Sequence, residues 1–221
     1  APDGRVFVAE RAGVIKVFDS LDDPTPDIFA DLRDRVFTND GRGLLGLALD
    51  PRWATKPYVY VLYAMDGPIG SAPPVYGGGG TDNCPTTGGP NECVVGGRLS
   101  RLSAATNTAG PENVLVEDWC QQWTTHSIGD LAFDSDGALY ASSGDGAFAG
   151  QPDYGQRGYH PNVCGDPPTA PGTAPTLPNA EGGALRSQDL RTAGDPTGLN
   201  GAIIRINPDT GAGWPGNPLA S

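Results

Sequence analysis

Glycine and proline recur at short intervals, and this constrains the fold of the chain more than any other feature. The 221 residues include 33 glycines and 22 prolines. No stretch of about 15 residues sustains the helical apolar period, so a protein built on long helices is excluded. No apolar stretch reaches the roughly 18 residues of a membrane-spanning helix, and the glycines lack the regular spacing of collagen.

The apolar residues fall in short runs with the patterns of β-strands. Residues 5–10 and 14–18 alternate on either side of Gly13, which predicts a hairpin. Residues 44–49 form a continuous apolar run, typical of a strand covered on both faces. Residues 58–63 are rich in aromatic and β-branched side chains. Further strands are expected at 94–102, 114–116, 131–133, 138–141 and 202–206.

A turn followed by an aromatic strand occurs more than once. The segment Pro-Asp-Gly-Arg-Val-Phe-Val-Ala at 2–9 resembles Ser-Asp-Gly-Ala-Leu-Tyr-Ala-Ser at 135–142, and residues 50–61 form a looser copy. Repetition of small all-β units favours a β-propeller, whose blades are four-stranded sheets, over a β-sandwich. About ten strands would make two to three blades. We therefore expect an all-β partial propeller.

Two long segments, 67–92 and 147–198, are rich in Gly, Pro, Thr and Asn. Loops of this length inside a domain are functional or disordered. A linker between two domains is a third interpretation, but the strands on both sides look alike. We therefore expect one domain over 1–221 with loop insertions near 67–92 and 147–198.

The chain is acidic, with a formal net charge of −12. Binding to nucleic acid requires a basic face, so this class of partner is disfavoured. The acidity favours solubility, and a second interpretation is that some carboxylates bind a hard cation such as calcium. No spacing matches an EF-hand loop, so the residues alone predict no metal ligands.

Four cysteines occur, and they allow three disulfide pairings. The Cys-x-x-Cys spacing typical of zinc and thioredoxin-like sites is absent. Cys84 and Cys93 flank a polar loop, so we expect one bridge there and a second between Cys120 and Cys164. Disulfides predict an oxidising compartment, hence a secreted or periplasmic protein. The sequence begins at Ala1 on a strand-like run, which suggests a mature or cut piece.

Four ordered blocks make the sequence resemble the soluble glucose/sorbosone dehydrogenase family. They include the Gly-Leu-Leu-Gly motif and the segment His-Ser-Ile-Gly-Asp-Leu-Ala-Phe, which runs into Ser-Gly-Asp-Gly. The blocks lie at residues 2–13, 41–48, 126–133 and 201–208. The resemblance implies a six-bladed propeller that oxidises aldose sugars with pyrroloquinoline quinone (PQQ) and calcium. It further implies that this chain is roughly the N-terminal half, with most calcium ligands beyond its end and an external electron acceptor.

The resemblance assigns a role to His126. A histidine before a strand is more often structural, but in the family the matching histidine is the general base that deprotonates the anomeric hydroxyl. An ordinary imidazole has a pKa of about 6.5, which suits this role. Asp145 follows one hairpin later, so the chain returns to the same end of the sheet. We expect Asp145 to hold and polarise His126, although Ser-Gly-Asp-Gly is also an ordinary turn sequence.

The sequence differs from the family pattern at positions near the expected sugar site. Gly41 stands where members often carry Gln or Glu, and the adjacent Arg42 is the bulky polar group there. Gln151 is a candidate substitute for a second sugar-contacting residue. Trp123 could stack on a sugar, but core packing is its more common role. These substitutions bear on which sugar is used.

Two other functions are considered. A non-catalytic propeller could bind carbohydrate or protein on the same scaffold. A glycoside hydrolase would need a pair of carboxylates, and four acidic residues cluster in sequence without a spacing that selects two of them. These are Glu117, Asp118, Asp130 and Asp145.

Overall fold

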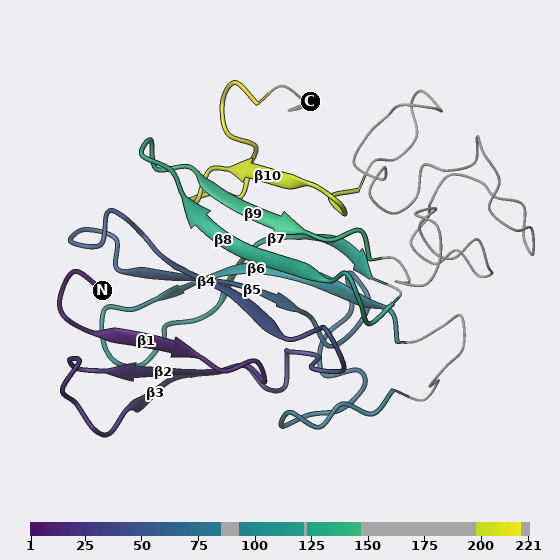
Figure 1. The fold of residues 1–221 in the computed structure, drawn as a ribbon, viewed down its shortest axis with the longest axis horizontal. Coiled ribbons are helices and arrows are strands. Elements are labelled where there is room, and N and C mark those ends of the chain that lie inside the picture. The colour runs from purple at the N-terminus through teal and green to yellow at the C-terminus, as the bar shows by residue number, and fades with distance from the viewer. Residues whose placement is uncertain (85–92, 122, 147–197, 218–221) are drawn as a thin grey trace, which may run out of the picture.

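The computed structural model describes residues 1–84, 93–121, 123–146 and 198–217 (Figure 1). Within these ranges the chain forms ten strands and no helix. The strands make three antiparallel sheets, each of consecutive strands (Figure 1). The expected all-β class is confirmed. In the described part of the chain, no helix is long and apolar enough to cross a membrane.

The first sheet consists of β1 (Val6–Ala9), β2 (Val14–Phe18) and β3 (Asp27–Asp31). Gly13 has a φ of 104°, and its N–H donates to the Glu10 carbonyl at 2.8 Å, which closes the predicted β1–β2 hairpin. Glycine tolerates this left-handed conformation without steric cost. Strand β3 was not anticipated from the sequence.

The second sheet is four-stranded, in the order β4 (Leu44–Leu49), β5 (Tyr58–Ala64), β6 (Val95–Ser103) and β7 (Asn113–Gln121). Strand β5 is paired on both sides, and nearly all of its residues are buried. The expectation that β4 is covered on both faces is wrong at Leu45, which is exposed. The pairing of β4 with β5 shifts register at this point.

The third sheet has the order β10-β9-β8, with β8 (Ile128–Phe133), β9 (Leu139–Ser143) and β10 (Ile203–Ile206). The predicted hairpin of β8 and β9 is present, with Phe133 opposite Leu139 at its closed end. Strand β10 pairs with β9 although 147–197, outside the described residues, separates them in sequence.

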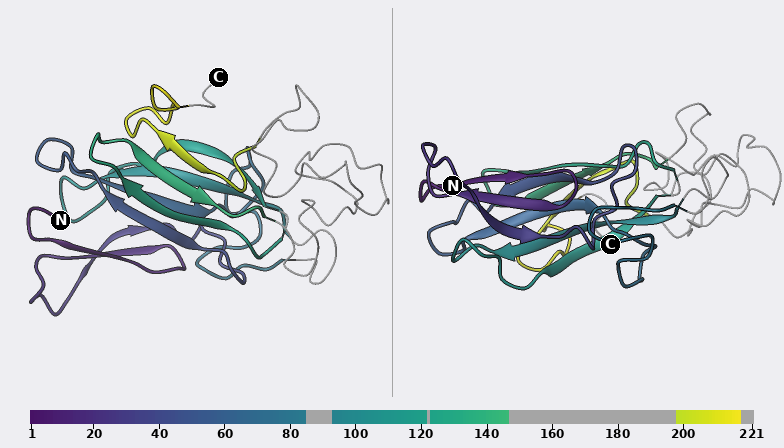
Figure 2. Two further views of the ribbon diagram at one scale, coloured as in Figure 1. Left: turned by 45° about the horizontal axis from the view of Figure 1, so that its top comes forward. Right: turned by 90° about the horizontal axis from the view of Figure 1, so that it is seen from below.

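The second sheet lies between the other two (Figures 1 and 2). One apolar cluster joins it to the first sheet, and another joins it to the third. The third sheet comes close at Gly46, where an added Cβ would lie 3.2 Å from Leu131 Cγ, and at Gly97, where an added Cβ would lie 2.7 Å from Ile128 Cγ2. Each cluster removes a continuous apolar surface from water, which is the main stabilising term in such a stack. The second cluster contains Tyr60, Leu62, Leu99, Trp119, Ile128, Leu131, Leu139, Ala141 and Ile206.

An ionic network joins the second and third sheets after the C-terminal end of β4. Asp50 accepts hydrogen bonds from Arg52 Nη2 at 2.8 Å and from Tyr60 Oη at 3.0 Å. Arg52 also pairs with Asp209, which follows β10, at 2.9 Å, and Lys56 binds the same carboxylate at 2.8 Å. Burial alone would raise the pKa of Asp50, but its hydrogen bonds with Arg52 and Tyr60 hold that pKa below its ordinary value.

The Cys84–Cys93 disulfide is present, with its Cα atoms 5.6 Å apart. It closes the predicted loop just before β6. Cys120 is also disulfide-bonded. Cys164, the partner predicted for it, lies outside the described residues, so the Cys120–Cys164 pairing stays a prediction that peptide mapping without reduction tests.

Candidate active site

His126 and Asp145 meet at the open end of the β8–β9 hairpin. His126 precedes β8 and Asp145 follows β9, and Ile128 pairs with Ser143 between them. Antiparallel strands therefore return Asp145 to the end of the sheet where His126 lies. His126 Nδ1 is 2.9 Å from Asp145 Oδ1. The histidine side chain is 46% exposed and that of the aspartate 16%, so the pair faces solvent from a partly enclosed position.

The backbone of His126 has a φ of 52°, in the left-handed region that side-chain-bearing residues seldom adopt. Two hydrogen bonds hold it there: Gly146 N donates to His126 O at 2.9 Å, and Gly144 N donates to Ser127 O at 2.7 Å. A Cβ at Gly144 would lie only 2.4 Å from His126 O. The close approach therefore requires glycine at 144. Uncommon backbone conformations of this kind cluster at functional sites.

Buried polar residues support the segment on either side of His126. Ser127 Oγ donates to Gln121 Oε1 at 2.8 Å, and both side chains are buried. Asn200 Nδ2 donates to the carbonyl of Cys120 at 2.9 Å, which ties the start of the third-sheet strand β10 to the end of β7. Neither the sequence pattern nor the family resemblance assigns a role to Gln121, Ser127 or Asn200. The glycines of Ser-Gly-Asp-Gly were the available signal that backbones approach closely here.

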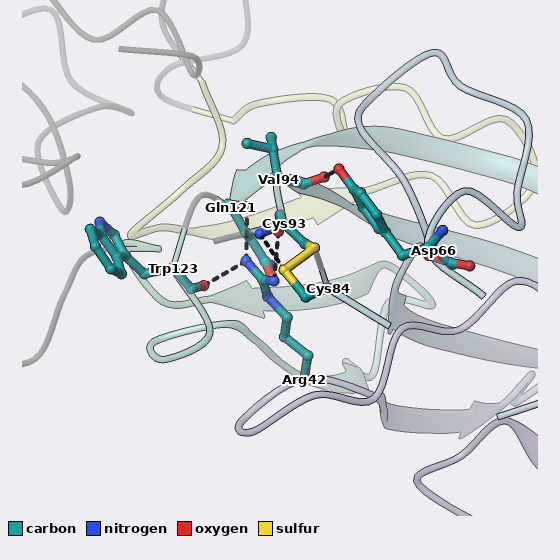
Figure 3. Close-up of a disulfide and its surroundings, with 8 residues drawn as sticks. Arg42, Asp66, Cys84, Cys93, Val94, Gln121 and Trp123 are labelled. Carbon is teal, nitrogen blue, oxygen red and sulfur yellow. Dashed lines mark hydrogen bonds between the residues drawn. A yellow bond between two sulfur atoms is a disulfide. The ribbon is translucent and has the colours of Figure 1, made fainter. Parts of the chain in front are cut away.

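The Arg42 side chain extends toward Gln121, Trp123 and Cys93 (Figure 3). This side chain is 0% exposed. Nη1 donates to Cys93 O at 2.8 Å, and Nη2 donates to Gln121 O at 2.9 Å and to Trp123 O at 2.7 Å. The Trp123 ring is buried and points away from the guanidinium group (Figure 3). Gln151, the third predicted sugar contact, lies outside the described residues.

The pair of His126 and Asp145 has the arrangement of a general base and its orienting group. A carboxylate accepts hydrogen bonds, so Nδ1 is the protonated ring nitrogen of the neutral imidazole. Nε2 is then the acceptor. The carboxylate would also stabilise the imidazolium that forms when Nε2 takes a proton.

Two of the four carboxylates considered for glycoside hydrolysis are held by other side chains. Glu117 pairs with Arg98 at 2.6 Å, and Asp145 contacts His126. Asp118 is exposed on β7. Among the described residues, no group of three or more His, Cys, Asp or Glu side chains could hold a metal ion. The site described here therefore rests on the imidazole–carboxylate pair.

Comparison with known proteins places the chain in a family. The model of the glucose/sorbosone dehydrogenase family matches residues 1–157. A crystal structure of a putative oxidoreductase (glucose dehydrogenase) from Thermus thermophilus matches 99% of this chain with a TM-score of 0.60 and 24% identity. The PQQ-bound form of aldose sugar dehydrogenase from Streptomyces coelicolor matches 99% with a TM-score of 0.58 and 20% identity.

The chain covers 44% of the Thermus protein and 46% of the Streptomyces protein. It therefore spans less than half the length of these two structures. The structural likeness confirms the expected fold, a partial β-propeller in which the three sheets are blades or parts of blades. The match to the family model extends over most of the chain, including β1 to β9 and both His126 and Asp145. The chain belongs to the glucose/sorbosone dehydrogenase family.

Proposed function

We propose that the protein containing this chain oxidises aldose sugars at the anomeric carbon, with PQQ as the hydride acceptor and His126 as the general base. The observation that carries the proposal is the 2.9 Å contact between His126 Nδ1 and Asp145 Oδ1, with the imidazole 46% exposed. Family membership supports the reaction class. The PQQ-bound state of the Streptomyces structure supports the cofactor.

His126 would act through Nε2. The neutral imidazole accepts the proton of the anomeric hydroxyl as the C–H bond at the same carbon breaks, which leaves a carbonyl in the lactone product. Asp145 keeps Nδ1 protonated, orients the ring and stabilises the positive charge that develops on it. Because the imidazole is exposed, a sugar can reach it, and the proton can pass to solvent afterwards.

PQQ, when bound, accepts the hydride, and we propose that calcium accompanies it. The described residues fit the proton-accepting part of such a site, because the His126 side chain is 46% exposed and its Nδ1 is already taken by Asp145. Arg42 is enclosed, so it does not offer its charge to an anionic cofactor. We assign no described residue to the quinone or to calcium, and an external electron acceptor would complete the cycle. Gln151 is retained as a proposed sugar contact, and the disulfides favour an extracytoplasmic location.

Substitution of the pair tests the catalytic assignment. His126→Asn suits the left-handed backbone, since asparagine is enriched in that region. In the intact protein with PQQ and calcium, we expect kcat for dye-linked aldose oxidation to fall about 10²- to 10⁴-fold. Asp145→Asn should lower kcat nearly as much. The double variant should have a kcat only slightly below that of either single variant, since the two residues act as one unit.

Asp136→Asn is the matched control, because Asp136 is exposed at the opposite, closed end of the same hairpin. It should leave kcat near the wild-type value. A folded His126→Asn protein with wild-type turnover would refute the role of His126. A wild-type protein that is inactive with PQQ and calcium would instead favour a non-catalytic propeller that binds carbohydrate or protein.

A further inference from the structure

Arg42 joins three parts of the chain that are distant in sequence. It precedes β4, and its guanidinium group donates to Cys93 O, next to the disulfide, and to the carbonyls of Gln121 and Trp123 (Figure 3). The guanidinium carbon also lies 5.3 Å from the centre of the Phe37 ring. A charged side chain is seldom fully buried without such compensation. The contacts indicate a structural anchor.

The anchored segment leads directly to His126. Gln121, whose carbonyl Arg42 holds, uses its side chain to accept the Ser127 hydroxyl at 2.8 Å. Ser127 is the residue after His126, and its carbonyl accepts the 2.7 Å hydrogen bond from Gly144 N. Two hydrogen bonds, joined through Gln121, therefore connect the Arg42 guanidinium group to Ser127, the residue bonded to the candidate base.

The two residues before Arg42 are hydrogen-bonded to Thr124, which also lies just before His126. Gly41 N donates to Thr124 O at 3.1 Å, and Thr124 Oγ1 donates to Asp40 Oδ2 at 2.7 Å. Asp40 has a φ of 55°, so this short loop is itself held in an uncommon conformation. The loop 40–42 is thus bound to Gln121, Trp123 and Thr124 by backbone, side-chain and charged hydrogen bonds. These hydrogen bonds fix the position of the backbone just before His126.

We propose that Arg42 is a positioning residue of the candidate active site, which holds the carbonyls of Gln121 and Trp123 so that His126 keeps its place against Asp145. The inference rests on the proposed function for its catalytic consequence. It replaces the expectation that Arg42 contacts the sugar, because a side chain with 0% exposure cannot reach a substrate without rearrangement. A small displacement of a catalytic group is enough to lower a rate about 10²-fold.

The geometry of the guanidinium group makes the test specific. Its planar fork serves several acceptors at once, whereas a lysine ammonium on a flexible stem offers a single point charge. Arg42→Lys should therefore keep the charge and lose part of the anchor. In the intact protein loaded with PQQ and calcium, we expect kcat to fall about 10-fold with KM for the sugar within about twofold of wild type. Arg42→Ala should lower kcat about 100-fold, with partial recovery on addition of millimolar guanidinium but not methylammonium.

Arg98→Met is the matched control for loss of a buried arginine, since Arg98 is also enclosed but pairs with Glu117 on the outer strand β7. We expect a lower melting temperature and unchanged kcat. The second readout is the imidazole ¹⁵N–¹H signal of His126, assigned by its loss in His126→Asn. This signal should move in Arg42→Lys and stay in place in Arg98→Met, whether or not turnover is detected.

The outcomes separate the two proposals. If the wild-type protein is inactive but Arg42→Lys still shifts the His126 signal, the proposed function is overturned and the positioning role of Arg42 is supported. Wild-type kcat and an unshifted His126 signal in Arg42→Lys would overturn the positioning role of Arg42 and leave the proposed function standing. A rise in KM with unchanged kcat would also overturn it, in favour of direct sugar contact. If Arg42→Ala does not fold, Arg42→Lys decides the question by the same measurements.

Discussion

His126 occupies a left-handed backbone conformation that depends on the residues opposite it. Gly146 N and Gly144 N supply two hydrogen bonds to the carbonyls of His126 and Ser127, and the absence of a side chain at 144 permits the approach. Such conformations cost of order 1–3 kcal/mol and persist where surrounding contacts determine them. The glycines that flank Asp145 thus hold the backbone of the residue that the carboxylate contacts.

Gly144→Ala should displace His126. The added Cβ would lie 2.4 Å from His126 O, a distance that backbone atoms can relieve only by moving. We expect kcat for aldose oxidation to fall at least about 10-fold, because the imidazole leaves its position against Asp145. The measurement is steady-state dye reduction, with circular dichroism to confirm folding.

Gly137→Ala provides the comparison. Gly137 has a φ of 85° at the closed end of the same hairpin, and an added Cβ meets nothing within 4 Å. This variant should lose stability through backbone strain and keep its kcat. Equal kcat in the two variants would show that the close approach of Gly144 to the His126 carbonyl does not position the imidazole.

The sequence predicted part of this site. The proximity of Asp145 to His126 followed from hairpin geometry, because two antiparallel strands return the chain to its starting end. The enclosure of Arg42 could not be predicted in this way, since a charged residue in a Gly-rich loop is ordinarily exposed. Its acceptors are main-chain carbonyls, and carbonyls carry no sequence signal. Catalysis by His126 stays a prediction.

At the scale of elements, alternation and turn chemistry predicted the hairpins well. The β1–β2 and β8–β9 pairs have clear apolar patterns on either side of a glycine turn. Strand β3 was missed because it is short and has an aspartate at each end, and its position comes from pairing with β2. Strand β7 extends beyond the predicted 114–116 through Glu117, which Arg98 on the adjacent strand neutralises. Tertiary pairing therefore overrides local propensity at these two strands.

The ionic network of Asp50 predicts a pH-dependent difference between variants. The pKa of Asp50 in the folded protein is below its ordinary value, so its ionised form contributes stability above the unfolded pKa of about 4. That contribution is lost as the pH falls through the lower, folded pKa. Asp50→Asn should reduce the free energy of unfolding by about 2 kcal/mol at pH 7, and the difference should shrink at strongly acidic pH.

Urea denaturation at neutral pH and below pH 3 would measure this difference, with Asp22→Asn as the control. Asp22 is exposed in a turn of the first sheet. The Asp22 variant should match wild type at both pH values. A constant difference between Asp50→Asn and wild type across the range would mean that the carboxylate charge contributes nothing to stability.

At the scale of the whole molecule, three sheets stack in chain order, and the second sheet is covered on both faces. The outer sheets present apolar side chains to solvent on edge strands: Ile28 on β3 is 59% exposed, and Ile203 on β10 is 72% exposed. Edge strands with exposed apolar residues are sites of association. The net charge of −12 opposes association, and salt screens that repulsion.

The 221-residue chain produced alone should therefore self-associate, increasingly so at high salt. Light scattering coupled to size-exclusion chromatography would report the mass. Joint replacement Ile28→Thr and Ile203→Thr should lower it. Leu21→Thr should not, because Leu21 is exposed in a turn outside the strands. A monomeric wild-type chain at all salt concentrations would contradict this expectation.

Gly46 makes the second and third sheets unsuitable for exchange as independent modules. At Gly46 the third-sheet residue Leu131 comes so close that an added Cβ would lie 3.2 Å from its Cγ, and glycine has no side chain that could adapt to a different neighbour. A chimera that joins one protein's second sheet to another's third sheet would retain this close packing only if position 46 and Leu131 came from the same parent. Crossover points for recombination libraries should therefore lie outside 46–206, so that the entire contact between the second and third sheets comes from one parent.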